Sequence, residues 1–297
     1  MSTLVEKPVP VRRSAPVESN RPPAARTLAR LAQPTAALAA VVLLLGVPFW
    51  LIISTAGKTQ AEALNPNLAA PSQWQLVENF ATVFADGRMV QAFLGSVLVM
   101  VPSVLGVLVL GSMAAWILGR RTGRGMALVY ALAISGIVLP PAVVTVVLLL
   151  RQLGLAGTAV GMVGVYMGMY LSTVIFFVTG FVRTIPAELE EAARVDGLGH
   201  WRTFWRIVVP NSGNFIAAIA VITFIASWNA FLWPLVVAQD QESWTVQVTL
   251  STFVTAQTIN IPQLFVAATV SILPLVFVFV FLQRFLVQGV AQTGLKG

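Results

Sequence analysis

The stretch MVQAFLGSVLVMVPSVLGVLVLGSMAAWILG, residues 89–119, runs for 31 residues without an Asp, Glu, Lys or Arg. Arg88 and Arg120 flank it. A helix needs roughly 20 mostly apolar residues to cross the hydrocarbon core of a bilayer. The stretch is long enough for this, and it therefore predicts a membrane-spanning helix.

The composition of the whole chain points the same way. Of its 297 residues, 57% are hydrophobic and only 10% are charged, whereas soluble domains are about 45–50% apolar and about 25% charged. A soluble fold of this size would lack the polar groups to cover so much apolar surface. The composition therefore argues against a soluble enzyme and, for most of the chain, against disorder.

Five more apolar segments follow from the same search, so the sequence predicts an all-α integral membrane protein with six spans. We expect the spans at about residues 34–56, 91–118, 126–150, 158–182, 208–237 and 264–286. Residues 1–33 carry five prolines among arginines and are expected to form a tail outside the six-helix domain of residues 34–297.

Two patterns within the spans predict local structure. Pro140 and Pro141 are adjacent, and because each removes a helix hydrogen bond, they predict a real break in the third span. Gly157/Gly161 and Gly164/Gly168 have the four-residue spacing that lets helix backbones approach closely. The spacing favours a role for these glycines in helix packing over a role in a substrate path.

The basic residues predict the orientation of the chain. With the N-terminus in the cytoplasm, 15 of the 18 Lys and Arg residues fall on the cytoplasmic side, and only Lys58, Arg88 and Arg151 fall outside. Both termini are then cytoplasmic, and segments 57–90 and 238–263 face outward. The net charge of +7 is explained by this topology, so we expect no nucleic-acid partner.

The residue types that are missing exclude several chemistries. The chain has no cysteine and one histidine, His200, which argues against a disulfide scaffold, a thiol nucleophile, a metal cluster and a Ser/His triad. The predicted spans carry no charged side chain, whereas proton-coupled transporters usually keep one in the membrane as a relay. We therefore expect no catalytic residue and no metal ligand, and any energy for transport must enter from outside the chain.

The segment RTIPAELEEAARVDGLGHWRTFWRIVVP, Arg183–Pro210, is the most informative loop. Acidic residues after Pro186 predict a short helix within residues 187–200, with Glu190 paired to Arg194 four residues later and with Leu189, Ala192 and Ala193 on one small face. Gly197 and Gly199 predict its end. The spacing of Trp201, Phe204, Trp205 and Val208 predicts a second, interfacial helix that leads into the fifth span.

This loop also carries a family resemblance. Glu191-Ala192-Ala193, three residues, Gly197, nine residues, Ile207, one residue, Val209 and Pro210 resemble the EAA loop of permeases from binding-protein-dependent ABC importers. The family pattern has Leu where this chain has Val209. The string WNAFLWPL, residues 228–235, is similar to one in the maltose-type smaller permeases of the carbohydrate branch, although Ala230 stands where an acidic residue is common.

The resemblance implies a MetI-like permease fold in the bacterial cytoplasmic membrane. It also implies a coupling helix within residues 187–200 that fits a cleft of a separate ATPase subunit. The residues implied in ATPase coupling are Glu190, Glu191, Ala192, Ala193, Asp196, Gly197, Ile207 and Pro210. Those implied for the substrate pathway are Trp228, Asn229 and Trp233, although packing explains the two tryptophans equally well.

The implied partners are two ATPase subunits, a second homologous permease that completes a heterodimer, an extracytoplasmic solute-binding protein and membrane lipid. This chain itself would bind no cofactor, because ATP and Mg²⁺ belong to the ATPase subunits. The implied cargo is a sugar or related polyol. The alternatives are a non-sugar solute such as a glycerophosphate compound and, from other classes, a stand-alone secondary transporter or a membrane enzyme.

Overall fold

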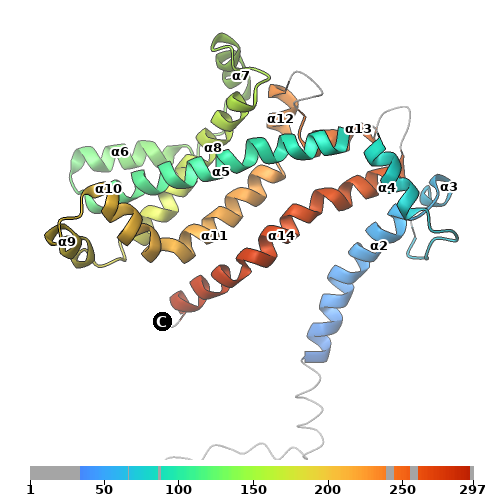
Figure 1. The fold of residues 1–297 in the computed structure, drawn as a ribbon, viewed down its shortest axis with the longest axis horizontal. Coiled ribbons are helices and arrows are strands. Elements are labelled where there is room, and N and C mark those ends of the chain that lie inside the picture. Colours follow the sequence, from blue (N-terminus) through green and yellow to red (C-terminus); the bar gives the residue numbers. More distant parts are fainter. Residues whose placement is uncertain (1–33, 66, 86–87, 239–243, 255–259, 295–297) are drawn as a thin grey trace, which may run out of the picture. The chain divides into compact units, whose positions relative to one another are not determined.

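The computed structural model describes residues 34–65, 67–85, 88–238, 244–254 and 260–294, and the side chains of the last range as far as residue 283 (Figure 1). The predicted tail of residues 1–33 lies outside the described residues. Every element that these ranges form is helical. The chain divides into two compact units, and the boundary between them falls between Trp50 and Leu51.

Five helices in the described ranges are long and apolar enough to cross a membrane: Pro34–Ala56, Arg88–Arg120, Ala159–Val182, His200–Trp228 and Ile261–Gln283. The first contains η1 (Val42–Gly46) and α2 (Val47–Ala56). All of its side chains from residue 34 to residue 50, the part in the first unit, are exposed. Such an apolar and exposed helix suits lipid contact.

The other elements, which follow in the second unit, are ordered along the chain as shown in Figure 1. They are α3 (Gln60–Ala63), α4 (Leu76–Ala85), α5 (Arg88–Arg120), α6 (Arg124–Ser135), α7 (Val143–Gln152), α8 (Ala159–Val182), α9 (Glu188–Val195), α10 (His200–Thr203), η2 (Phe204–Val208), α11 (Val209–Trp228), α12 (Leu232–Val237), α13 (Val246–Thr252) and α14 (Ile261–Gly294).

The third predicted span is not one helix. In place of a continuous helix over residues 126–150, the chain forms α6 and α7, which are 12 and 10 residues long. The seven residues between them, 136–142, include Pro140 and Pro141. The predicted break is therefore confirmed, and it shortens both halves below the length of a single spanning helix.

The fifth predicted span, residues 208–237, is also divided. α11 ends at Trp228, and Asn229 closes it by donating from its side-chain amide to the carbonyl oxygen of Ile225 at 2.8 Å. The six-residue α12 follows after a short break, with Pro234 inside it. The spans are predicted from stretches without charged residues, and no charged residue lies at this break. The sequence therefore predicts a single helix here, which is wrong.

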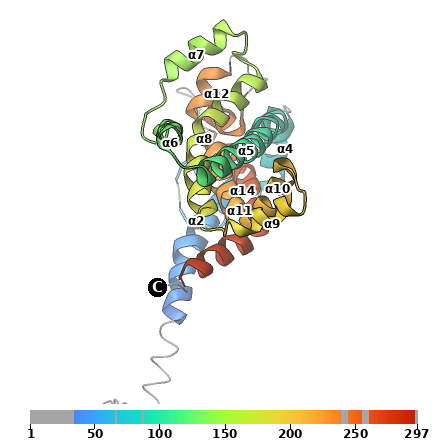
Figure 2. The same cartoon turned by 90° about the vertical axis from the view of Figure 1, so that its left-hand side faces the viewer.

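The core of the second unit lies between α5 and α8, which pack along each other (Figure 2). Valines and alanines of α5, α8 and α14 and, from α11, Ile219 and Trp228 form most of the buried cluster. Helices in a bilayer are held together by close packing of small residues more than by the hydrophobic effect. At Gly111 of α5, an added Cβ atom would lie 2.6 Å from Cγ1 of Val174 on α8, and at Gly119 it would lie 3.0 Å from Cγ1 of Val182.

Gly164 and Gly168 of α8 do not have the packing role that their spacing predicted. Gly161 of α8 is buried and closely packed, since an added Cβ atom would meet the carbonyl group of Leu155, but this contact is to the turn before α8 and not to another helix. A Cβ atom added at Gly164 or Gly168 would meet nothing within 4 Å. Gly157 lies before α8 in a turn with φ +75° and donates its N–H to the carbonyl oxygen of Val237 at 3.1 Å. The close helix contact is therefore made by glycines of α5, and Gly164 and Gly168 face open space.

The segment after the first long helix is held by one lysine and one asparagine. Lys58 is buried, and its Nζ donates to the backbone and side-chain oxygens of Asn67 at 3.0 and 2.9 Å. The side-chain amide of Asn79 on α4 donates to the carbonyl oxygens of Ala56 and Lys58 at 2.8 and 3.1 Å. These bonds satisfy backbone groups that the end of a helix leaves free.

The α5–α8 contact generates a stability prediction. Gly111→Ala should lower the midpoint of thermal unfolding of the purified chain, because the new methyl group overpacks Val174 at a cost of about 1–3 kcal/mol. Gly180→Ala on α8 is the matched control, since nothing lies within 4 Å of its added Cβ atom. An equal midpoint for the two variants would contradict this account of the packing.

Candidate functional site

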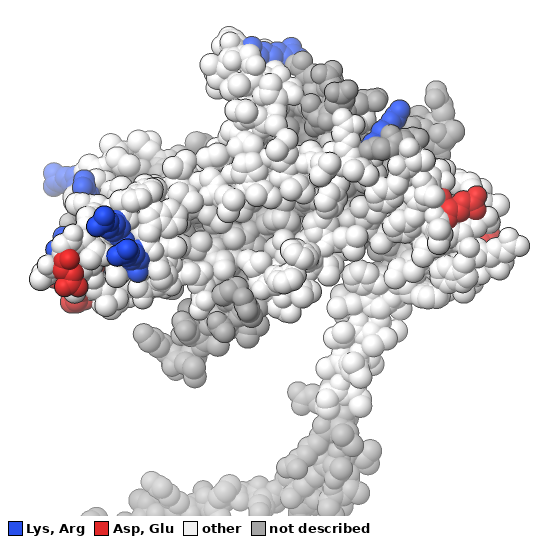
Figure 3. Space-filling view, viewed as in Figure 1, with Lys and Arg blue, Asp and Glu red and all other residues white. Residues whose placement is uncertain are grey.

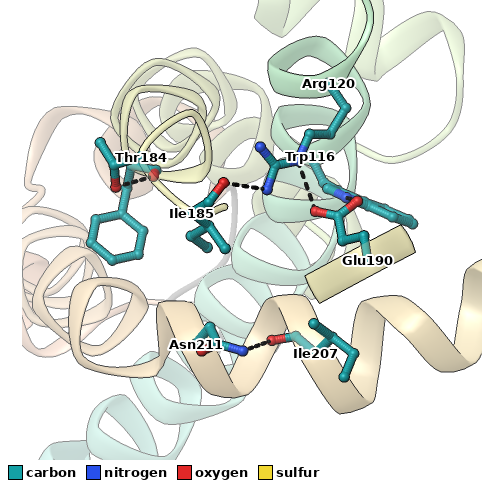
Figure 4. A network of polar contacts seen from close by, with 8 residues as sticks. Trp116, Arg120, Thr184, Ile185, Glu190, Ile207 and Asn211 are labelled. Carbon is teal, nitrogen blue, oxygen red and sulfur yellow. Dashed lines mark hydrogen bonds and ion pairs between the residues drawn. The ribbon is translucent and has the colours of Figure 1, made fainter. Parts of the chain in front are cut away.

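A buried ion pair joins α9 to the end of α5 (Figure 4). Glu190 is only 2% exposed, and its Oε1 lies 2.7 Å from Nε of Arg120, the last residue of α5. Its second oxygen, Oε2, accepts a hydrogen bond from the indole Nε1 of Trp116 at 2.9 Å. Both carboxylate oxygens of Glu190 are thus bonded to α5.

The same arginine reaches a third element. Its Nη2 donates to the carbonyl oxygen of Ile185 at 2.9 Å, in the turn that follows α8 (Figure 4). The ring of Trp116 lies against Phe204 of η2, with 5.8 Å between the ring centroids. Phe204 is 2% exposed. Arg120 and Trp116 therefore connect α5 with the end of α8, with α9 and with η2.

The observed partners of Glu190 differ from the predicted one. The helix spacing favoured a surface pair with Arg194, which typically contributes about 0.3–0.5 kcal/mol. The carboxylate instead points away from solvent to Arg120 and Trp116. Because Glu190 is buried, removal of Arg120 would leave the carboxylate charge uncompensated, which is costly. The position of α9 therefore depends on this contact and not on the predicted surface pair.

The other predicted coupling residues of α9 lie on two faces of the helix. Glu191 and Ala192 are exposed, but Ala193 is 4% exposed and faces the protein together with Glu190. The predicted small face of Leu189, Ala192 and Ala193 is therefore not one surface, because the first two residues are exposed and the third is buried. Val195, which the sequence pattern did not single out, is 89% exposed. The free surface of α9 is a ridge of Leu189, Ala192 and Val195 with acidic side chains beside it.

The end of α9 has the geometry that the glycine predicted. Asp196 is the exposed C-cap residue. Gly197 follows with φ +79°, a left-handed conformation that favours glycine. The N–H of Leu198 donates to the carbonyl oxygen of Ala193 at 2.9 Å, and the N–H of Gly197 donates to that of Arg194 at 3.0 Å. This pair of bonds is the Schellman motif.

The predicted second helix is not separate from the fifth span. α10, η2 and α11 run without a break from His200 to Trp228. Ile207 lies within the wider π-turn of η2 and is half-buried, and its carbonyl oxygen accepts from the side-chain amide of Asn211 at 2.7 Å (Figure 4). Pro210 is exposed and has no N–H for the turn before it. Trp201 and Trp205 are exposed, as an interfacial position requires.

Two of the three predicted pathway residues serve the fold. Trp228 is 4% exposed, its Nε1 donates to the carbonyl oxygen of Ser271 on α14 at 2.9 Å, and its ring stacks with that of Phe224 at 5.9 Å. Asn229 is exposed, but its side-chain amide closes α11. The packing interpretation is therefore the one that fits Trp228.

Trp233 of α12 lies differently. It is also 4% exposed, but it lines a cavity of about 440 Å³ together with residues of the broken third span and of α8. The diproline break supplies Pro140 and Pro141, and α8 supplies Gly164 and Gly168, whose lack of side chains leaves the space open. The cavity wall is mostly apolar and carries no charged residue.

Charged side chains gather at the ends of the helices in the face that Figure 3 shows. Red and blue atoms lie together over the region of α9 and α10, while the surface along α5 is white (Figure 3). Within the described ranges, no group of three or more His, Asp or Glu side chains could hold a metal ion.

The sequence pattern did not identify Arg120 and Trp116 as site residues. Arg120 counted only as a basic residue of a loop, and Trp116 was not singled out. The sequence does contain one indication: Trp116 and Arg120 carry polar groups one turn apart at the end of an otherwise apolar helix. Such groups need a hydrogen-bonding partner when they are buried. Nothing in the sequence identified Glu190 as that partner, 70 residues away.

Comparison with known proteins agrees with this arrangement. The family described as "Binding-protein-dependent transport system inner membrane component" matches residues 107–292. The chain is 31% identical over 250 residues to the diacetylchitobiose uptake system permease protein of Streptomyces coelicolor, a match that covers 83% of this chain and 82% of that protein. It is 28% identical over 254 residues to the melibiose/raffinose/stachyose import permease protein of Bacillus subtilis, with 84% and 91% covered.

A solved structure shares the fold. It is a bacterial ABC transporter involved in the import of the acidic polysaccharide alginate, and it matches with a TM-score of 0.75 over 89% of this chain and 98% of that chain, at 19% sequence identity. The resemblance based on residues 191–210 is confirmed. The chain belongs to the family of binding-protein-dependent transport system inner membrane components, the permeases of ABC importers, and is a multi-pass membrane protein.

Proposed function

We propose that this chain is one membrane-spanning subunit of an ATP-driven importer for a sugar or related polyol. The observation that carries the proposal is α9, a short helix with an exposed ridge and acids on one face and a buried charge anchor on the other. ATP and Mg²⁺ would be bound by two separate ATPase subunits. A second, homologous permease and an extracytoplasmic solute-binding protein complete the transporter.

In the proposed topology, the chain crosses the membrane six times and both termini are cytoplasmic. The five long helices supply five crossings, and α6 and α7 together supply the sixth around the break at Pro140. The 15 to 3 bias of basic residues supports this orientation. The α9 segment then faces the cytoplasm, and residues 57–90 and 238–263 face the solute-binding protein.

The ATPase would bind the free ridge of α9. Leu189, Ala192 and Val195 present apolar atoms, and Glu188 and Glu191 present charge beside them. A groove with an apolar floor and a basic rim suits this surface, in the manner of an amphipathic helix in a groove. Asp196 and Gly197 shape the turn that leads away from it, while Ala193, Ile207 and Pro210 support the loop from within or behind.

The proposed cargo is supported by two features. The named relatives are permeases of diacetylchitobiose and melibiose/raffinose/stachyose uptake systems. The cavity beside Trp233 has no charged residue in its lining and contains an indole ring. Pockets for neutral small molecules are lined mostly by apolar and aromatic side chains. We therefore assign this cavity, with Trp233, to the substrate pathway, in place of Trp228 and Asn229.

The coupling role of α9 predicts a charge-reversal phenotype. Glu191→Lys should abolish uptake in vesicles while the complex still assembles, because the new positive charge would repel the basic rim of the ATPase groove. Glu18→Lys, in the tail of residues 1–33 outside the six-helix domain, is the control and should transport normally. Normal uptake by the Glu191 variant would contradict the assignment.

The pathway assignment predicts a contrast between two tryptophans. Trp233→Ala should raise the KM for uptake by about tenfold, the effect of losing about 1.4 kcal/mol of contact. Trp228→Phe keeps the ring stack and loses only the bond to Ser271, so it should leave KM unchanged and lower the thermal stability of the chain. The assignment fails if both variants change KM to the same extent.

The proposed function as a whole is tested by purification of the tagged chain from its native membrane. Recovery of an ATPase subunit and of a second permease in a fixed ratio, with ATP-dependent uptake after reconstitution, is the expected result. A chain that transports alone along an ion gradient would instead establish the stand-alone secondary transporter.

A further inference from the structure

We infer that Glu190, Arg120 and Trp116 form a mount, a set of bonds that makes α9 move as one rigid body with α5 and α8. Movement of the ATPase subunits is then transmitted to the membrane-spanning helices through α5 and α8, and not through α10 and α11. The inference rests on the proposed function and adds Arg120 and Trp116 as positioning residues. Neither residue touches the ATPase or the cargo in this scheme; they act through α9.

The mount is stiff because its bonds are short, are partly shielded from solvent and join different elements. Glu190 is bonded to α5 through both carboxylate oxygens, at 2.7 and 2.9 Å. Arg120 is simultaneously bonded to Ile185 at 2.9 Å, which ties the turn after α8 to the same point. A planar guanidinium held by two acceptors keeps one orientation, since its donors are fixed in a fork.

The body to which α9 is mounted is itself rigid. α5 and α8 pack at glycine positions where an added Cβ atom would lie 2.6 to 3.0 Å from a valine methyl group. Gly119, one residue before Arg120, is one of these positions. Closely packed interfaces transmit displacement because they have little room to deform. A displacement of α9 is therefore transmitted to α5 and α8 with little deformation of the contact between these two helices.

The covalent route from α9 to α11 is the more compliant one. It passes through Gly197 in a left-handed conformation and then through Leu198 and Gly199, which are not helical. It continues into η2, a π-turn of Phe204–Val208 that ends two residues before Pro210. π-turns and prolines are where helices bend. The Trp116–Phe204 contact holds the start of η2 on α5, so this path absorbs rotation between α9 and α11 in the π-turn after Phe204.

Distances between pairs of spin labels test the inference in a chain that keeps Glu190, Arg120 and Trp116. The chain has no native cysteine, so introduced pairs are specific within it. One label replaces Arg194, an exposed residue of α9 outside the ridge, and the second replaces either Leu110 on α5 or Ile222 on α11, which are also exposed. The complete complex, assembled with cysteine-free partners in nanodiscs, is measured by pulsed electron paramagnetic resonance without nucleotide and with ATP trapped.

The expected result is one distance from 194 to 110 in both states and two different distances from 194 to 222. A shift of the 194–110 distance as large as that of the 194–222 distance would overturn the inference. Glu190→Gln should broaden the 194–110 distribution, whereas Glu188→Gln, on the exposed side of the same helix, should not.

Transport provides a second readout. Glu190→Gln and Arg120→Gln should each lower the amount of cargo moved per ATP hydrolysed by about tenfold, with ATPase subunits still bound. The double variant removes both charges and should recover part of the coupling, because no unpaired buried charge remains. Trp116→Phe keeps the ring against Phe204 and loses only the N–H, so it should give a smaller loss of coupling.

The outcomes separate the two proposals. Normal coupling in the single variants, or strictly additive effects in the double variant, would overturn the mount while the importer function stands. If the single variants fail to assemble, the Trp116 variant and the label distances in the unmodified chain still decide the question. A wild-type chain that binds no ATPase would refute the proposed function itself.

Discussion

A charged side chain buried at the end of an apolar helix must be paired, and this requirement organises the site. The energetic cost of leaving Glu190 or Arg120 alone exceeds what surface contacts of α9 could offset. α9 is only eight residues long, too short to be stable as an isolated helix. Its fold is therefore stabilised by the bonds of Glu190 to Arg120 and Trp116 of α5 and by the Schellman turn at Gly197.

The placement of small residues divides the bundle into a closed side and an open side. On α5, glycines lie where α8 approaches, so the two helices are in close contact. On α8, Gly164 and Gly168 lie where no neighbour approaches, and they leave the cavity beside Trp233. The same residue type thus closes one contact and opens another, depending on whether a second helix supplies side-chain atoms opposite it.

The sequence predicted what depends on composition and on local spacing. The apolar lengths located the long helices, Pro140 and Pro141 predicted the break after α6, and Gly197 predicted the end of α9. It could not predict contacts between residues far apart in the chain. The partner of Glu190 is an arginine 70 residues earlier, and the local rule for helical pairs selected Arg194 instead.

The tryptophans illustrate the same limit within the candidate site. Trp228 and Trp233 lie five residues apart and are equally buried, so neither composition nor spacing separates them. They differ in what the tertiary structure places opposite each ring. Trp228 faces Ser271 and Phe224, whereas Trp233 faces a cavity whose walls come from a proline break and from α8. Such a difference becomes visible only when the helices have been placed in space.

The π-turn of η2 also sets a rotational register. A π-turn is equivalent to one extra residue in an α-helix, and each residue of an α-helix turns the chain by about 100°. Because of the extra residue, Phe204 faces Trp116 while Ser212, Ile219 and Thr223 of α11 are buried in the protein. Deletion of one residue from Phe204–Val208 would restore a regular helix and rotate the aromatic side chains before it away from α5. The length of this one turn is therefore as much a part of the coupling loop as the residues that its motif names.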